Sequence, residues 1–326
     1  MRFKLLCIVG LTLLTISVFG QDTQLNTPLK IRNQFLPFSP LLQLQPEGTA
    51  LIPEGQDEIA TALYKGNVHI YQYNNLNQPV FVVDGETTRF EISYRKNIGY
   101  GLELFAALPY VWNGPGILDN FTETWHGWFG LPNGGRELEP QDLFILQTDK
   151  LDIRQGNKGV GDPYFSLKKS LENSLLPLAL KFSLQLPLSG EDFVGSGTLD
   201  VGLALLSDYY PASWLYVYGS LGMTASLGES RLKEKLSYDS PYSIQWALGF
   251  ALLPFSSFSL FMQVFYQTSP YKSGYPSFDE ASLVHSMGFR WKVFKDMIWQ
   301  LSIDEDTFGI YHGTDYTMTT HWEMRF

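Results

Sequence analysis

The sequence has 326 residues, a formal net charge of −10, 15% aromatic residues, 29 glycines and a single cysteine. This acidic balance argues against nucleic acid as a partner and against a basic protein of the membrane surface. After the first twenty residues, no stretch approaches the roughly 18 uninterrupted apolar residues of a membrane-spanning helix.

The first twenty residues have the order of a secretory signal peptide. Arg2 and Lys4 precede an apolar run over residues 5–19, and the small residue Gly20 follows it;. We expect cleavage near Gly20, which removes two positive charges and changes the formal net charge from −10 to −12. Cleavage also removes Cys7, so the exported chain forgoes disulfides and must gain its stability from a large closed structure.

Residues 21–56 form a proline-rich segment. Prolines at positions 28, 37, 40, 46 and 53 break any long strand or helix;. The apolar stretches 35–38 and 41–42 are nevertheless too hydrophobic for a tail that is exposed to solvent. Since the rest of the chain predicts a barrel, we expect this segment to pack near or inside it, under its periplasmic mouth or as a partial plug. A disordered linker is the alternative.

From residue 57 onwards, apolar and polar residues alternate in about twelve runs, which is the period of a β-strand. The clearest runs cover residues 242–252, 178–188, 102–110, 297–303 and 90–94. Weaker runs cover 57–71, 159–170, 197–209, 213–227, 257–268 and 280–292, and the last covers 315–326. Their recurrent aromatic face favours contact with lipid. A soluble β-sandwich is the alternative.

The connections between these runs alternate in length. The short ones cover residues 96–99, 171–174, 210–213, 254–257 and 293–296. The longer and more polar ones cover 72–85, 112–158, 189–196, 228–239, 270–279 and 306–314. Outer-membrane barrels have short periplasmic turns and longer outer loops. We therefore predict an all-β fold: a closed antiparallel transmembrane β-barrel of about twelve strands, within ten to fourteen, over residues 57–326.

The inward face of the predicted strands carries charges of both signs. The candidate lumen-lining residues are Arg89, Glu91, Arg95, Glu103, Lys168, Lys181, Asp200, Arg290, Asp304, His321, Glu323 and Arg325. They suit a wet channel whose charges select solutes, or a salt-bridged filling of the barrel. Because eight strands are just filled by side chains and sixteen leave an aqueous channel, twelve strands leave both interpretations open.

The longest predicted loop, residues 112–158, is the candidate functional insertion. Its constriction candidates are Trp125, His126, Trp128 and Arg136. Because Trp125, Trp128 and Phe129 are unfavourable in water, we expect the loop to bury them. It would do so by folding into the mouth, by covering the barrel as a lid, or by stacking on sugars of a ligand or of lipopolysaccharide. Simple packing of the loop is the leading interpretation.

The histidines do not form a catalytic pattern. A known outer-membrane phospholipase is a twelve-stranded barrel whose serine and histidine lie on one strand with one residue between them. Here His285 directly precedes Ser286, which places the two side chains on opposite faces;. His69 and His321 could meet where the first and last strands close, although a lumen histidine is the simpler interpretation. We expect no catalytic residues.

Metal and cofactor sites are also not expected. The acidic residues 304–306 and Asp315 could hold Ca²⁺ through carboxylate oxygens, but their spacing matches no calcium loop, and a solvated rim is favoured;. The sequence contains no zinc spacing, nucleotide loop or redox cysteine pair. We therefore predict no cofactor.

Four stretches together resemble an uncharacterised proteobacterial outer-membrane family, a family with a domain of unknown function. They are Ile31–Gln34, Phe129-Gly-Leu-Pro-Asn-Gly-Gly-Arg136, Gly161-Asp-Pro163 and Trp322–Phe326. The resemblance implies a barrel of the Gram-negative envelope without an established activity, so no functional residue carries over. The Gly-Asp-Pro hairpin is also similar to that of outer-membrane proteins thought to transport aromatic compounds, which favours transport.

We predict a passive channel or uptake protein for small polar or amphipathic solutes in the outer membrane of a Gram-negative bacterium. The alternative is a plugged structural or surface-interaction barrel without transport, and an outer-membrane lipid hydrolase comes third. The expected partners are the lipid bilayer, lipopolysaccharide, a small solute, and the barrel assembly machinery through the last strand, which ends at Phe326 on the periplasmic side. Nucleic acid is not among them.

Overall fold

The structure is a computed structural model that describes residues 25–76, 78–133, 135–171, 176–228, 242–306 and 314–326. The expected signal peptide lies outside these residues, as does most of the predicted loops 228–239 and 306–314. In the described part of the chain, no helix has the length and apolar character needed to cross a membrane.

Twelve long strands of the described chain form a closed antiparallel barrel. They are β1 (Asp57–Tyr73), β2 (Pro79–Gly99), β3 (Leu102–Gly114), β7 (Tyr164–Leu171), β8 (Leu178–Gln185), β9 (Leu199–Ala212), β10 (Leu215–Leu227), β11 (Tyr242–Phe255), β12 (Phe258–Gln267), β13 (Ser282–Phe294), β14 (Met297–Asp306) and β15 (Tyr316–Arg325). Each strand pairs with its neighbours in chain order, and β1 pairs with β15 to close the barrel. The predicted fold class is confirmed.

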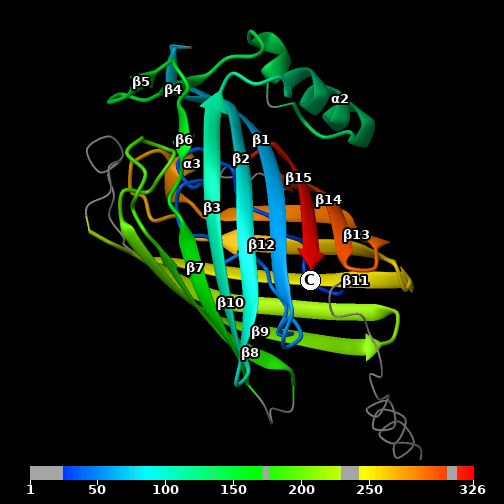
Figure 1. Ribbon diagram of the computed structural model, residues 1–326. Helices are drawn as coiled ribbons and strands as arrows, with labels where there is room; N and C mark the ends of the chain where they lie inside the picture. The colour runs from blue at the N-terminus through cyan, green and yellow to red at the C-terminus, as the bar shows by residue number, and fades with distance from the viewer. Residues whose placement is uncertain (1–24, 77, 134, 172–175, 229–241, 307–313) are drawn as a thin grey trace, which may run out of the picture.

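The two ends of the barrel differ, as the alternating connections predict. One end carries the short turns, such as residues 213–214 and 256–257, and we call it the short-turn end. The other carries the longer connections and is the long-loop end. The predicted loop 72–85 is wrong in length, because β1 and β2 stay paired as far as Tyr73 and Pro79. In Figure 1, β1–β3 and β15 run steeply across β9–β12, so the barrel is flattened.

Further short elements lie at the long-loop end. Between β3 and β7 the chain forms α2 (Asp119–Phe129), η1 (Arg136–Leu138), β4 (Ile145–Gln147), β5 (Asp152–Ile153) and β6 (Lys158–Val160), and α3 (Pro276–Asp279) precedes β13. β4 pairs with β2 and β6 pairs with β3. The predicted long loop therefore extends the wall beyond the level of the other strands.

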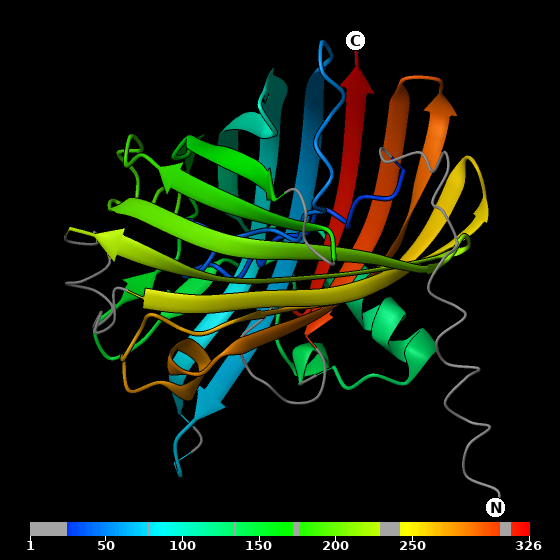
Figure 2. The ribbon, with the colours of Figure 1, turned by 90° about the horizontal axis from the view of Figure 1, so that it is seen from below.

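The interior of the barrel is occupied by residues 25–52, which we call the N-terminal hairpin. It begins at the short-turn end, where Leu25 and Asn26 line a recess together with residues 255–257 and 292–295. It turns at Phe35–Ser39 near the long-loop end and returns to the start of β1 at Asp57. Figure 2 shows this segment between the two crossing groups of strands. Almost all of its residues are buried.

Candidate functional site

All twelve candidate lumen residues lie on the inward face and are at most 9% exposed. They are Arg89, Glu91, Arg95, Glu103, Lys168, Lys181, Asp200, Arg290, Asp304, His321, Glu323 and Arg325. The strand period explains this placement, because side chains of alternate residues point to the same face. The lumen, with the hairpin inside it, is the candidate functional site.

The first limb of the hairpin, residues 25–34, is held mainly by neutral contacts. The Gln300 amide on β14 donates to the carbonyl of Lys30 at 2.8 Å and accepts from its N–H at 3.0 Å. Leu29 and Ile31 pack in a buried cluster whose aromatic members include Tyr218 of β10 and Phe261 of β12. The Gln300 side chain thus forms with Lys30 the two backbone hydrogen bonds that a neighbouring strand would otherwise provide;.

The turn of the hairpin is cross-braced by its own side chains. The Arg32 guanidinium donates to the carbonyls of Ser39 and Leu41, at 3.0 and 2.8 Å. The Gln43 amide bonds both the N–H and the carbonyl of Asn33, each at 2.9 Å. These bonds join the two limbs, so the hairpin is a folded unit rather than a loose chain.

An aromatic cluster covers the turn at the long-loop end. Phe35 and Phe38 pack with Phe81 of β2 and with residues of the connections at this end, which are Phe144, Leu146, Leu151, Tyr271 and Phe278. The Phe35–Phe278 ring centroids are 5.7 Å apart. The second half of the long loop therefore acts as a lid over the hairpin.

The second limb, residues 40–52, begins with further amide contacts. Gln245 of β11 accepts from the N–H of Leu44 at 2.7 Å and donates to the carbonyl of Leu42 at 3.1 Å. Gly202 and Gly222 of the wall face Leu44, and an added Cβ would lie only 2.8 and 2.6 Å from its side chain. These glycines make room for the hairpin.

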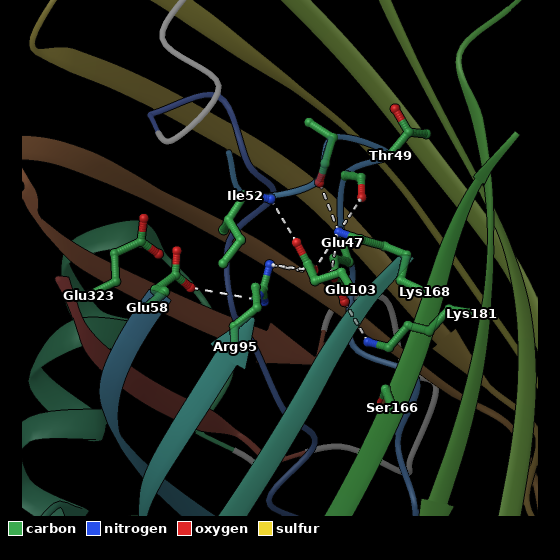
Figure 3. Close-up of polar contacts among 12 residues, drawn as sticks. Glu47, Thr49, Ile52, Glu58, Arg95, Glu103, Ser166, Lys168, Lys181 and Glu323 are labelled. Carbon is green, nitrogen blue, oxygen red and sulfur yellow. Dashed lines mark hydrogen bonds and ion pairs between the residues drawn. The ribbon is translucent and has the colours of Figure 1, made fainter. Parts of the chain in front are cut away.

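The second limb then reaches an ionic centre around Glu47 (Figure 3). The Glu47 carboxylate lies 2.8 Å from Lys168 Nζ, 2.5 Å from Lys181 Nζ and 3.4 Å from Arg95 Nη1. These cations come from β7, β8 and β2. Lys168 also donates to the carbonyl of Ala50 at 2.8 Å. A buried carboxylate requires such compensation, because desolvation alone would be prohibitive.

Two wall carboxylates complete the ionic centre. Glu103 of β3 pairs with Lys168 at 3.1 Å and with Arg95 at 3.5 Å. Glu58 of β1 pairs with Arg95 at 3.5 Å and with Arg325 of β15 at 2.9 Å. The network therefore spans the closure of the barrel between its first and last strands.

The remaining charged candidates lie in smaller groups. Arg290 pairs with Glu323 at 2.7 Å, and His321 Nδ1 lies 3.9 Å from the same carboxylate. Arg89 pairs with Glu91 at 3.2 Å. The last two candidates lie apart from these pairs: Asp200 accepts from the Leu42 N–H, and Asp304 is buried on β14.

Two small voids lie in the described part of the lumen. One void of about 10 Å³ lies between Lys30, Glu58, Arg95 and His321, and another of about 10 Å³ lies beside Asp200. Each has room for about one water molecule. The buried residues of the hairpin occupy the space around these voids.

The constriction candidates of the long loop lie at the rim rather than in the lumen. α2 covers the outward face of Tyr316 on β15, whose ring lies 5.8 Å from that of Trp125. Trp128 and Phe129 are 69% and 59% exposed, so the expectation that the loop buries both is wrong. Their helical spacing places them on the same face of α2 as Trp125, whose ring lies 4.4 Å from that of Phe129;. A membrane interface would favour such exposed aromatic rings.

Arg136 fixes α2 to the rim. Its guanidinium donates to Asp119 at the start of the helix and to Asp315 before β15, each at 2.5 Å. His126 Nε2 lies 3.8 Å from the Glu305 carboxylate. Burial alone lowers the pKa of His126, but the interaction with Glu305 and the charge of Asp315 together outweigh it, so this pKa is raised. Arg136 thus connects the start of α2 to the residue before β15.

The histidines do not assemble a site. His285 and Ser286 lie on opposite faces of β13, as their adjacency requires. His321 pairs across the closure with Ala62, which is seven positions before His69, or about 23 Å along the strand;. The suggested meeting of His69 and His321 is therefore wrong. Within the described residues, no group of three or more His, Cys, Asp or Glu side chains could hold a metal ion.

Glu47 is the central functional candidate that sequence reasoning missed. Glu47 is the one carboxylate of residues 25–52, and this is a usable signal, because a buried charge must find opposite charges elsewhere;. The partners Lys168 and Lys181 were both identified as inward residues. Their distance of more than a hundred positions from Glu47 hid the connection.

Comparisons with known proteins give a family and a fold. The model of DUF3187, described as a protein of unknown function, matches residues 6–326. The COG4313 outer membrane channel from Pseudomonas putida F1 superposes with a TM-score of 0.57 and 12% identity, over 87% of this chain and 100% of that chain. The NanC porin (TM-score 0.46, 8% identity) covers 82% of this chain and 98% of its own. No curated protein matches the chain. These identities establish similarity of fold alone.

Proposed function

We propose that this chain, which belongs to the DUF3187 family, is an outer-membrane channel closed by its own N-terminal hairpin. It passes small polar or amphipathic solutes across the outer membrane of a Gram-negative bacterium when the hairpin moves. The proposal assigns no enzymatic activity and no cofactor. The signal-peptide pattern of residues 1–20 supports export, with cleavage near Gly20;.

The outer surface of the barrel supports a membrane location. Large apolar side chains stand exposed on neighbouring strands, among them Phe182 at 48%, Leu248 at 56% and Met262 at 54%. In water such a continuous apolar surface would drive aggregation, whereas a bilayer matches it. The short-turn end with Phe326 would face the periplasm, and α2 with Trp128 would lie in the outer interface beside lipopolysaccharide. Recognition of the last strand by the barrel assembly machinery fits the same orientation.

The hairpin's topology is the observation that carries the channel proposal. Both of its ends lie at the short-turn end, so it can leave the lumen as a loop without threading a chain end through the barrel. Its contacts with the wall are hydrogen bonds, ion pairs and apolar packing, none of them covalent among the described residues. Its withdrawal would leave a lumen lined by polar and charged side chains, which suits solute passage.

A second candidate function is a permanently plugged structural or surface-interaction barrel. The burial of the hairpin inside the described lumen favours it, since wall side chains such as Gln245, Gln300 and Lys168 bond its backbone and side chains. The two candidates differ in one respect only: whether the hairpin leaves the lumen under native conditions.

A reversible lock tests this difference. A Cβ added at Gly66 of β1 would lie 2.5 Å from the Gln34 Cβ, closer than the roughly 3.8 Å of a disulfide, so a shift of about 1 Å suffices;. The exported chain has no other cysteine. In planar bilayers, reduced Gln34→Cys/Gly66→Cys protein should show discrete conductance and the oxidised protein should be silent, with Gly66→Cys alone as control. Silence of wild type and of both forms would favour the structural barrel.

A further inference from the structure

The wall side of the ionic centre has the composition of an anion-binding site. Lys168, Lys181 and Arg95 are 2%, 8% and 6% exposed, and all three point at one carboxylate that the hairpin supplies. Charge-assisted hydrogen bonds of this kind are among the strongest that proteins form. The cations belong to three different strands of a rigid wall, so they hold their places when the hairpin moves.

The wall alone carries excess positive charge at this point. Four cations, Arg95, Lys168, Lys181 and Arg325, face the two wall carboxylates Glu58 and Glu103. Glu47 is the third carboxylate and leaves with the hairpin. Among the described residues, Glu47 is the one carboxylate with which Lys181 forms an ion pair. Withdrawal of the hairpin therefore leaves a local excess of two positive charges.

An apolar surface adjoins these cations. The ring of Phe105 on β3 lies 5.5 Å from the Arg95 guanidinium carbon and 6.0 Å from Lys181 Nζ. Phe105 packs against Tyr164 of β7 at 5.5 Å between ring centroids, and Leu42 of the hairpin covers this surface. The hairpin thus presents a carboxylate and an apolar side chain to one composite surface of the wall.

We infer that Glu47 and Leu42 occupy the binding site of the transported solute, which is a small organic carboxylate with an apolar or aromatic body. This inference rests on the proposed channel function and names its solute class. The hairpin acts as an internal competitor: it supplies the carboxylate in the closed state, and the solute supplies it in the open state. A neutral solute of the same shape leaves Lys181 without an opposite charge.

Chemical rescue tests the anion site without any measurement of transport. Glu47→Ala removes a CH₂–COO⁻ group, and acetate has the size and charge of the missing part. For the exported full chain in detergent, we expect a lower guanidinium midpoint for Glu47→Ala than for wild type. Acetate should restore at least half of the loss, whereas acetamide and chloride should not. Glu47→Ala/Lys181→Met should show no acetate rescue. Equal rescue by acetamide, or no rescue of the folded variant, would overturn the inference.

Conductance tests the solute class. Glu47→Gln is isosteric and keeps the packing of the hairpin, so it remains informative if Glu47→Ala fails to fold. In a potassium chloride gradient, its reversal potential should have the sign expected for a conductance that selects chloride over potassium. Benzoate should reduce the chloride current at a concentration at least about tenfold lower than its neutral isostere benzamide. Lys181→Met in the same background should remove this difference.

The outcomes separate the two proposals. Conductance that is cation-selective, or equally sensitive to benzoate and benzamide, would overturn the solute class and leave the channel intact. Silence of Glu47→Gln and of the reduced cysteine variant would overturn the channel. Acetate rescue would then decide alone whether the wall binds carboxylates.

Discussion

Two segments that are not wall strands dock onto this barrel, one inside and one outside, and the wall holds them differently. Inside, most buried polar side chains of the hairpin have a partner in the hairpin or the wall, and Gln34 and the Arg32 Nε are exceptions among the described residues;. Outside, α2 depends on the Arg136 bridge and on aromatic contact with Tyr316, and it leaves Trp128 exposed. The difference predicts that hairpin contacts are worth more than rim contacts of the same chemical kind.

The largest effect should come from the ionic centre. Lys168→Met leaves Glu47 and Glu103 buried with less compensation, so we expect a loss of about 3–5 kcal/mol in the free energy of unfolding. Denaturant unfolding of the protein in detergent measures it. The matched control is Lys169→Met, because Lys169 is the next residue, faces outward and is exposed. Similar losses in both variants would contradict the predicted contrast between inside and outside.

A substitution at the rim should cost less free energy than Lys168→Met, and it should loosen only α2. Arg136→Met removes the bridge between Asp119 and Asp315, and we expect α2 docking to weaken by about 1.5–3 kcal/mol while the barrel keeps its stability;. Limited proteolysis within residues 112–158 measures the opening. Arg154→Met is the control, because the Arg154–Asp152 pair is exposed and should contribute less than about 1 kcal/mol;. A global loss in Arg136→Met would show that α2 supports the wall.

The loss of a neutral hairpin contact should cost slightly less free energy than the loss of the Arg136 bridge. Gln300→Leu leaves the N–H and carbonyl of Lys30 without their partner, so we expect a loss of about 2 kcal/mol and hydrogen exchange of this limb that is faster by roughly thirtyfold;. Gln267→Leu is the matched control, since the Gln267 amide is equally buried but forms no hydrogen bond in the described structure. Equal exchange in both variants would mean that the glutamine is not what holds the limb.

The sequence predicted the strands of the barrel wall far better than the placement of the hairpin inside it. Period-2 alternation located all twelve strands, and the same parity placed residues such as Arg95 and Lys181 on the inward face. The placement of the hairpin depends on contacts such as Lys30 with Gln300, which are 270 positions apart, and no local pattern encodes them. α2 did leave a signal. Phe121, Trp125, Trp128 and Phe129 have helical spacing, yet their apolar character alone did not reveal which side of the barrel they would occupy.

The smallest predicted effect is the pH dependence of the rim. The pKa of His126 is raised above 6.5 in the folded chain by Glu305, despite the opposing effect of burial. While Glu305 is ionised, the ion pair therefore stabilises α2 fully below pH 6.5, and the contribution disappears as pH rises through the folded pKa of His126;. We expect a few tenths of a kcal/mol, at most about 1, because the two groups are 3.8 Å apart, which is long for an ion pair;.

Fluorotryptophan NMR should follow this change at Trp125, with its resonance assigned by its loss in Trp125→Phe. His126→Gln should remove the dependence. The neighbouring charges Asp315 and Arg136 stay paired with each other in that variant, so they do not replace the histidine. The opposite sign, with docking that tightens as pH rises, would mean that the carboxylate of Glu305 rather than His126 controls the rim. The hairpin, enclosed by the wall, should remain docked over the same range, and this contrast separates a rim titration from general loosening of the barrel.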